Sequence, residues 1–230
     1  MNHLYKRDLT NGSIAGSMLR FALPLMLGNL LQQCYNIADT LIVGQVLGAE
    51  ALAAVGSSYA LIVFITSIFI GLCMGCSAVL SIQYGAKDIQ QMKQSIFSSL
   101  LIVGGTTLLL NILSLTFLSP IIKILQTPPE LEAMTYRYLF LIFLGMIPMA
   151  VYNFYAFLLR SVGNSSSPLY FLLISVALNI VLDVLFMVGL KMGVEGAALA
   201  TVISQIVSAA GIYLYTWKPV SYTHLTLPTK

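Results

Sequence analysis

The sequence contains very few charged residues. Only 11 Lys or Arg and 8 Asp or Glu occur among 230 residues, so 8% of the chain is charged and 58% is hydrophobic. Soluble domains carry about 25% charged residues, because polar groups must cover a surface that faces water. This composition excludes a soluble globular domain and indicates a protein embedded in a lipid bilayer.

Clustered basic residues and paired cysteines are also missing. The net charge is +3, and most basic residues stand singly between apolar runs. We therefore expect no nucleic-acid partner, which would require a basic patch. Cys34, Cys73 and Cys76 all lie within apolar runs, and three cysteines placed there do not fit a disulfide framework. We interpret Cys73 and Cys76, with Gly71 and Gly75, as small residues in a helix-packing interface.

Six long apolar runs dominate the chain. They cover residues 18–44, 51–84, 95–119, 134–160, 168–190 and 194–217. About 20 apolar residues cross a bilayer as a helix, and runs without alternation favour helices over barrel strands. We expect an all-α integral membrane protein, with a polar N-terminal segment (1–17) followed by six transmembrane helices that form one lobe (18–219). The polar segment has no short apolar core and cleavage site, so we expect no cleaved signal peptide.

The basic residues between the apolar runs indicate an orientation. Seven fall on one side of the expected helices: Lys6, Arg7, Arg20, Lys87, Lys93, Arg160 and Lys218. Three fall on the other side: Lys123, Arg137 and Lys191. Basic residues in short loops concentrate on the cytoplasmic side, so we expect a multi-pass protein with a cytoplasmic N-terminus.

The final residues, 220–230, do not continue this pattern. Residues 220–229 read VSYTHLTLPT, which resembles the translation of a sequencing adapter. We interpret this stretch as a non-native tail and expect the natural protein to continue beyond about Pro219.

Proline and glycine mark breaks in the expected helices. Pro24 and Pro148 each remove an intrahelical hydrogen bond, which predicts a kink that is either static or part of a bending motion. Gly163 and Asn164 predict the end of the fourth helix. We expect a serine cap for the fifth helix, with Pro168 at its first position.

Two acidic residues, Asp39 and Asp183, lie inside apolar runs. An ionised carboxylate in hydrocarbon costs several kcal/mol, so such acids face a bundle interior or a hydrated cavity and are functional candidates. The alternative is a permanently protonated aspartate that makes a packing hydrogen bond. Polar residues form three helix faces, each within about 120° on a helical projection, and two of these faces include one of the acids. The three polar faces are Asn29, Gln32, Gln33, Asn36 and Asp39; Ser175, Asn179 and Asp183; and Thr201, Ser204, Gln205 and Ser208.

Three polar helix faces of this kind can enclose a small hydrated pocket. Its carboxylate, amide and hydroxyl oxygens are hard ligands that suit a proton or an alkali cation, whereas zinc requires His or thiolate. The sequence therefore predicts a site for H⁺ or Na⁺, with no other metal and no cofactor.

Several segments together resemble a known family, the multidrug and toxic compound extrusion (MATE) transporters. The matching segments are ALPL (22–25), NLLQQ (29–33), YNIADT (35–40), GAEALAAVG (48–56), LRSVGN (159–164), NIVLD (179–183) and GVEGAALAT (193–201). Their order and spacing are similar to the family's over most of residues 20–217. The family has twelve helices in two lobes, and this chain resembles the N-terminal lobe alone, with the C-terminal lobe missing.

The resemblance implies a secondary active antiporter of the cell membrane rather than an enzyme. Family members export organic cations or other toxic compounds against entry of Na⁺ or H⁺. The family's coupling site corresponds to Asp39, Asn179, Asp183 and Thr201, with Asn153 nearby and Pro24 as the bending point. We expect the cavity to be lined by Asn29, Gln32, Gln33, Asn36 and Gln205.

Two alternative functions remain. A lipid-linked oligosaccharide flippase of the same superfamily predicts a more basic cavity than the almost Lys- and Arg-free helices here. An intramembrane aspartyl protease would use the two aspartates as an acid–base pair. Asp183 lacks the glycines of the GxGD pattern of such proteases, so the antiporter is the preferred function.

Overall fold

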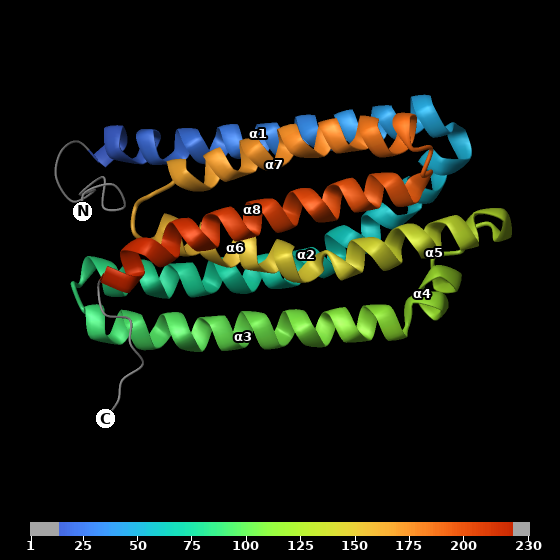
Figure 1. Ribbon diagram of the computed structural model, residues 1–230. Helices are drawn as coiled ribbons and strands as arrows, with labels where there is room; N and C mark the ends of the chain where they lie inside the picture. Colours follow the sequence, from blue (N-terminus) through green and yellow to red (C-terminus); the bar gives the residue numbers. More distant parts are fainter. Residues whose placement is uncertain (1–13, 223–230) are drawn as a thin grey trace.

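The computed structural model describes the backbone of residues 14–222 and the side chains of residues 15–217. This part of the chain is helical, which confirms the expected all-α class. Its elements are α1 (Ile14–Leu47), α2 (Ala49–Gly85), α3 (Ile89–Thr116), α4 (Leu118–Ile124), α5 (Pro129–Leu144), α6 (Met146–Ser161), α7 (Ser166–Asp183), the π-helical η1 (Val184–Gly189) and α8 (Val194–Tyr222). The long helices run side by side along one axis (Figure 1).

The helices occupy the six expected apolar runs. Four helical stretches are long and apolar enough to cross a membrane: α2, α3, the α7–η1 stretch and α8. The pair α5 and α6 provides a fifth span, so the chain is a multi-pass membrane protein. Helix α1, with 34 residues, is also long enough to cross a membrane but is not among these four, and it carries the polar residues Asn36 and Asp39. It packs along α7 and α2.

The fourth span is bent by 42° between α5 and α6. Pro148 has no N–H to donate to Leu144, the last residue of α5, so the helix breaks where the sequence predicts a kink. Gly145 stands at the break, and a Cβ there would lie 2.6 Å from Val202 Cγ2 of α8. The absence of a Cβ at Gly145 therefore lets α8 approach closely. Pro24, by contrast, lies inside the continuous helix α1.

The predicted end of α6 is confirmed, and a serine, Ser165, stands at the N-cap position of α7 as expected, but its side chain makes no capping hydrogen bond. Gly163 has a positive φ of 82°, and the Asn164 N–H donates to Leu159 O at 2.9 Å. The preceding residue, Asn164, supplies the side-chain hydrogen bond instead, because its Oδ1 accepts from the Ser167 N–H at 3.1 Å. Helix α7 begins at Ser166, so Pro168 is its third residue and not its first.

The expected packing role of Gly71 and Gly75 is wrong. Space is open where a Cβ would stand at each glycine, and both line a groove of about 590 Å³ between α2 and α3. Cys73 points the other way and packs against Leu80 and Phe154 in a buried cluster. Residues 71 and 75 differ from residue 73 by about 200° around the helix, which explains why they face the groove.

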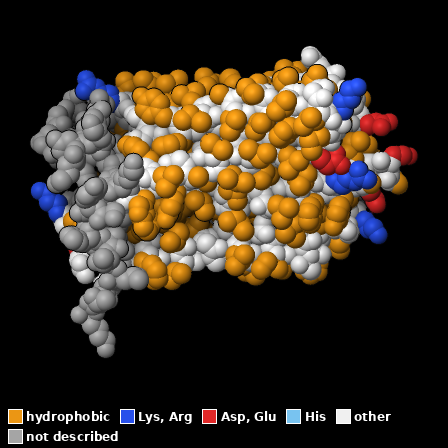
Figure 2. Space-filling model, in the orientation of Figure 1, with side chains coloured by type: hydrophobic (Ala, Val, Ile, Leu, Met, Phe, Trp, Pro, Cys, Tyr) orange, Lys and Arg blue, Asp and Glu red, His pale blue; other side chains and the backbone are white. Residues whose placement is uncertain are grey.

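Charged side chains gather at the two ends of the molecule, and apolar side chains cover the face between them (Figure 2). The α2–α3 and α6–α7 connections lie at the end where α1 begins (Figure 1). The α1–α2, α3–α5 and α7–α8 connections lie at the opposite end. This arrangement places Arg160 at one end of the bundle and Arg137 and Lys191 at the other, as the sequence predicts. That the end with Arg160 faces the cytoplasm stays a prediction. Lys6, Arg7 and residues 223–230 lie outside the described residues, as does the side chain of Lys218.

Candidate cation site and adjoining cavity

Asp39 of α1 and Asp183 of α7 meet inside the helix bundle. The two carboxyl groups lie close enough to interact directly. Asp183 has no exposed surface and Asp39 is half-buried. The Oδ1 atom of each carboxyl group is buried without a hydrogen-bond partner. Two adjacent buried carboxylates cannot both stay charged and uncompensated, so the pair requires a proton or a cation.

Asn179 and Thr201 complete this group of residues. Asn179 lies one helical turn before Asp183, and one amide orientation gives partners to both ends of its side chain. In that orientation it donates to Asp183 Oδ2 at 2.8 Å and accepts from the Thr201 backbone N–H at 3.1 Å. The structure therefore brings Asp39, Asn179, Asp183 and Thr201 together. Their role as ligands of a proton or cation stays a prediction.

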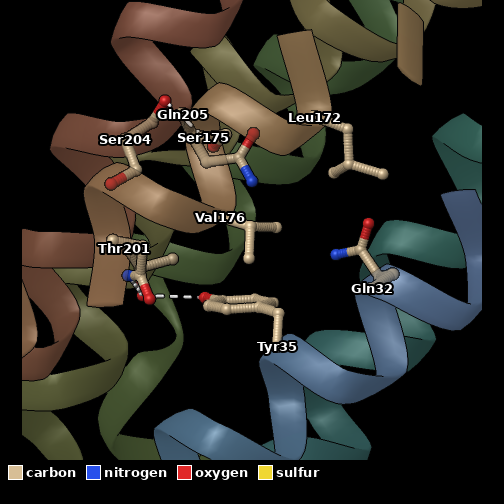
Figure 3. Close-up of a pocket in the computed structure, with 9 residues that line it drawn as sticks. Gln32, Tyr35, Leu172, Ser175, Val176, Thr201, Ser204 and Gln205 are labelled. Atoms are coloured by element: carbon tan, nitrogen blue, oxygen red, sulfur yellow. Dashed lines mark hydrogen bonds between the residues drawn. The ribbon is translucent and has the colours of Figure 1, made fainter. Parts of the chain in front are cut away.

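Two tyrosines of this site were missed in the sequence. The Tyr35 hydroxyl lies 3.2 Å from Thr201 Oγ1, and either atom can donate (Figure 3). Its position one turn before Asp39 on the same face of α1 is a pattern from which it could have been predicted. Tyr138 of α5 is buried and interacts electrostatically with both aspartates. No motif predicts Tyr138, because its place depends on how α5 packs.

A small cavity lies beside these residues, between α1, α7 and α8 (Figure 3). Its volume of about 10 Å³ is close to the minimum for one water molecule. Tyr35, Ser175, Asn179, Thr201 and Gln205 line its polar side. Polar contacts run from Tyr35 through Thr201 and Asn179 to the carboxyl pair, which provides a hydrogen-bonded connection between the cavity and the buried acids.

A larger cavity of about 370 Å³ adjoins the small one. Both cavities are bordered by Gln32, Leu172, Ser175 and Gln205. Side chains from α1, α2, α6, α7 and α8 line the larger cavity, and many are apolar or aromatic, including Ile62, Ile70 and Phe157. This volume and lining are typical of sites for small organic molecules.

The predicted cavity residues have different outcomes. Four of the five line the larger cavity, namely Asn29, Gln32, Asn36 and Gln205. Gln33 borders neither cavity, so its prediction is wrong: its side chain is exposed and its Oε1 accepts from Asn36 Nδ2 at 3.0 Å. It occupies the edge of the polar face farthest from Asp39, which explains the error.

Pro24 and Asn153 also line the larger cavity. Asn153 donates to Met149 O of its own helix at 2.9 Å and makes no direct hydrogen bond to either aspartate. The predicted site is therefore divided, with four residues at the carboxyl pair and Asn153 in the adjoining cavity.

The geometry can be compared with known proteins. The model of the family MatE matches residues 24–185. The chain is 33% identical over 198 residues to "Probable multidrug resistance protein YpnP" of Bacillus subtilis (strain 168), covering 86% of this chain and 44% of that protein. It is 32% identical over 206 residues to "Multidrug export protein MepA" of Staphylococcus aureus (strain NCTC 8325 / PS 47), covering 88% of this chain and 45% of that one.

A solved structure described as "Crystal structure of MATE in complex with MaD5" is similar as well. The TM-score is 0.87 at 27% sequence identity, and the match covers 99% of this chain and 50% of that chain. The chain thus spans about half the length of the relatives that it matches.

Proposed function

This chain belongs to the MatE family, and from this membership we propose that it is the N-terminal six-helix lobe of a secondary active multidrug efflux antiporter. The complete transporter exports organic cations or other toxic compounds from the cell and takes up H⁺ or Na⁺ in exchange. The half-length match to the relatives supports a second lobe elsewhere in the natural chain. Substrate passes between the lobes without chemical change, so the protein is no enzyme and needs no cofactor.

The observation that carries this proposal is the carboxyl pair of Asp39 and Asp183, with two buried oxygen atoms that lack partners. Two adjacent carboxyl groups inside a membrane protein can bind one positive charge, either a proton or a cation. The site adjoins the larger cavity through the polar residues shared by both cavities, so its occupancy can affect the substrate site. This arrangement fits an antiporter, in which the ion and the substrate bind in turn.

The local hydrogen bonds favour H⁺ over Na⁺ as the coupling ion. In the orientation that gives partners to both ends of its amide, Asn179 presents its nitrogen to Asp183 and its oxygen to the Thr201 N–H. A sodium ion at the carboxyl pair would need additional oxygen ligands, so the Asn179 amide would have to turn around. A proton needs only the two carboxyl groups, which would share it.

We assign helix α1 as the element that couples the ion site to the larger cavity. It carries Asp39 at the ion site, and it carries Asn29 and Gln32 in the lining of the larger cavity. Pro24 removes one backbone hydrogen bond from the same helix, which lowers the cost of bending there. Protonation of the carboxyl pair would change the attraction between α1 and α7 and move the cavity-lining residues with α1.

The flippase is the weaker alternative. A flippase for a lipid-linked oligosaccharide must accept a diphosphate, which favours several basic residues in the cavity. Arg160 is the only charged residue among the described residues that line the larger cavity. A small organic molecule fits this lining better.

The test measures transport by the full-length protein in everted membrane vesicles of the cell membrane. Movement of a fluorescent organic cation is followed after a pH gradient or a Na⁺ gradient is imposed separately. We expect the pH gradient to drive transport and the Na⁺ gradient to have little effect. Transport that follows neither gradient would contradict the antiporter, and transport driven by Na⁺ alone would contradict the choice of H⁺.

A further inference from the structure

Arg160 has an unusual position for a basic residue at the end of a membrane span. It lies in the last turn of α6, and its side chain lines the larger cavity rather than the outer surface. Its guanidinium carbon stands 4.9 Å from the centre of the Phe157 ring. Its Nε atom is buried without a hydrogen-bond partner. Within residues 15–217, no carboxylate forms an ion pair with this guanidinium.

The start of α7 adds to the positive potential at this end of the cavity. Ser165 directly precedes the 18-residue helix α7, lines the cavity and leaves its hydroxyl out of the helix cap. The first N–H groups of a helix carry partial positive charge. The Tyr152 hydroxyl donates to Pro168 O at 3.0 Å and ties α6 to the first turn of α7. Arg160 and the residue that precedes α7 therefore both line this cavity, and no carboxylate of the described residues lines it with them.

A partly buried positive charge without a negatively charged partner is energetically costly. The cavity beside Arg160 has room for an anion that would serve as this partner. A guanidinium binds phosphate or carboxylate oxygens through paired N–H donors, and the bond is strongest where water is excluded. Arg137, by contrast, has 66% of its side chain exposed and forms an ion pair with Glu195 at 3.2 Å, so it has no comparable need for an anion. The cavity therefore differs at its two ends, with amide groups near α1 and a cationic group where α6 meets α7.

We propose that Arg160 and the Ser165 hydroxyl form an oxyanion subsite, which binds a phosphate or carboxylate group inside the cavity. The anion comes from a phospholipid headgroup or from an amphiphilic substrate whose apolar part lies against Phe157 and the aliphatic lining. This inference rests on the proposed function, because it assigns a second chemical group to the same cavity. It extends the substrate class from cations to zwitterions and anionic amphiphiles.

The test uses the purified 230-residue chain in maltoside micelles, which contain no anionic group. Binding is measured by microscale thermophoresis with inorganic phosphate, acetate, dihexanoyl phosphatidate and dihexanoyl glycerol, which lacks the phosphate. We expect saturable binding of the oxyanions and none of dihexanoyl glycerol. Much tighter binding of the phosphatidate than of phosphate identifies a lipid headgroup, and similar binding of phosphate and acetate identifies a free anion or substrate group.

Matched variants assign the binding to Arg160. Arg160→Gln should weaken oxyanion binding about tenfold or more, since it removes the paired donors. Arg137→Gln removes the same charge from the opposite end, together with the exposed ion pair to Glu195, and should bind like the wild-type chain. Absence of binding to the wild-type chain, or equal binding by Arg160→Gln, would overturn the proposal.

A second measurement does not depend on the folding of a variant. Phenylglyoxal modifies accessible arginines, and the extent at Arg160 and Arg137 is read by peptide mass spectrometry. Bound phosphatidate should slow modification of Arg160 in the wild-type chain and leave Arg137 unchanged. Equal rates at Arg160 with and without the anion would contradict the subsite. Neither the binding measurement nor the phenylglyoxal measurement uses an ion gradient. A negative result in them would therefore leave the antiporter proposal intact. Failure of ion-driven transport would likewise leave the oxyanion-binding results intact.

Discussion

With its amide nitrogen turned toward Asp183, Asn179 donates a 2.8 Å hydrogen bond to Asp183 Oδ2, one helical turn further along α7. The other carboxyl oxygen of Asp183, Oδ1, is buried and has no hydrogen-bond partner. It is available to bind the proton or cation that we propose Asp39 and Asp183 share. The Asn179 amide contacts one side of the carboxyl pair, and we propose that the ion binds on the other side. The consequences can be tested at each residue.

The first prediction concerns the two aspartates in the full-length transporter. Asp39→Asn and Asp183→Asn should each abolish ion-driven efflux with membrane insertion and abundance near normal, because an amide keeps the size of the side chain but cannot cycle a proton. Efflux of a fluorescent cation is measured together with protein abundance. Asp88→Asn is the matched control, since Asp88 caps α3 outside the site and an amide also caps. Wild-type efflux and pH response in either aspartate variant would make that residue a packing residue.

The second prediction separates a proton from a sodium ion at the carboxyl pair. Infrared difference spectra of the purified chain should contain the band of a protonated carboxylic acid, which disappears in Asp183→Asn. Addition of Na⁺ at constant pH should leave the band unchanged, since Asn179 turns its nitrogen and not its oxygen toward Asp183. Loss of the band on addition of Na⁺ would support a site that exchanges the two ions.

The third prediction concerns the bend between α5 and α6. Gly145→Ala should lower the free energy of unfolding by about 1–3 kcal/mol, because its Cβ would clash with Val202 of α8 and overpacking is destabilising. Thermal unfolding in detergent measures the effect, and the double variant Gly145→Ala with Val202→Ala should recover part of the loss. Gly71→Ala is the control, since its Cβ would meet open space. Equal stability of Gly145→Ala and the wild-type chain would contradict the close approach.

The fourth prediction concerns topology. Reporter fusions after Gln45, Gln126 and Met192 should report the outside of the cell, and fusions after Lys87 and Ser165 the cytoplasm. The two groups of positions lie at opposite ends of the helix bundle, and the basic residues favour the second group as cytoplasmic (Figure 1). A cytoplasmic result at Gln126 would contradict the six-span arrangement.

The spacing of polar residues predicts much of the candidate site. Asn179 and Asp183 are four residues apart, so one face of α7 carries both, and the cost of a charge in hydrocarbon directs that face inward. The same reasoning fails for Gln33, because a helical projection gives the width of a polar face but not which edge stays covered. It also misses Tyr138 and the position of Arg160 inside the cavity. Those depend on how α5 and α6 bend and pack, which no local pattern specifies.

The last prediction is that the 230-residue chain inserts into a membrane but does not transport. Substrate cavities of such transporters form between repeats or lobes, and alternating access requires one bundle to move against another. This chain provides one bundle, and its exposed Gln33, which borders neither cavity, would lie against lipid, where polar groups lack water. We therefore expect self-association or degradation of part of the inserted chain.

The carboxyl pair is a different case, because Asp39, Asn179, Asp183 and Thr201 assemble within the described residues without a second lobe. The chain should keep proton or cation binding, seen as the infrared band that Asp183→Asn removes, although it moves no substrate. Liposomes that contain the purified chain should show no gradient-dependent uptake of a fluorescent organic cation. The full-length transporter, reconstituted in the same way, is the positive control. Robust ion-driven uptake by the 230-residue chain alone would refute the need for a second lobe.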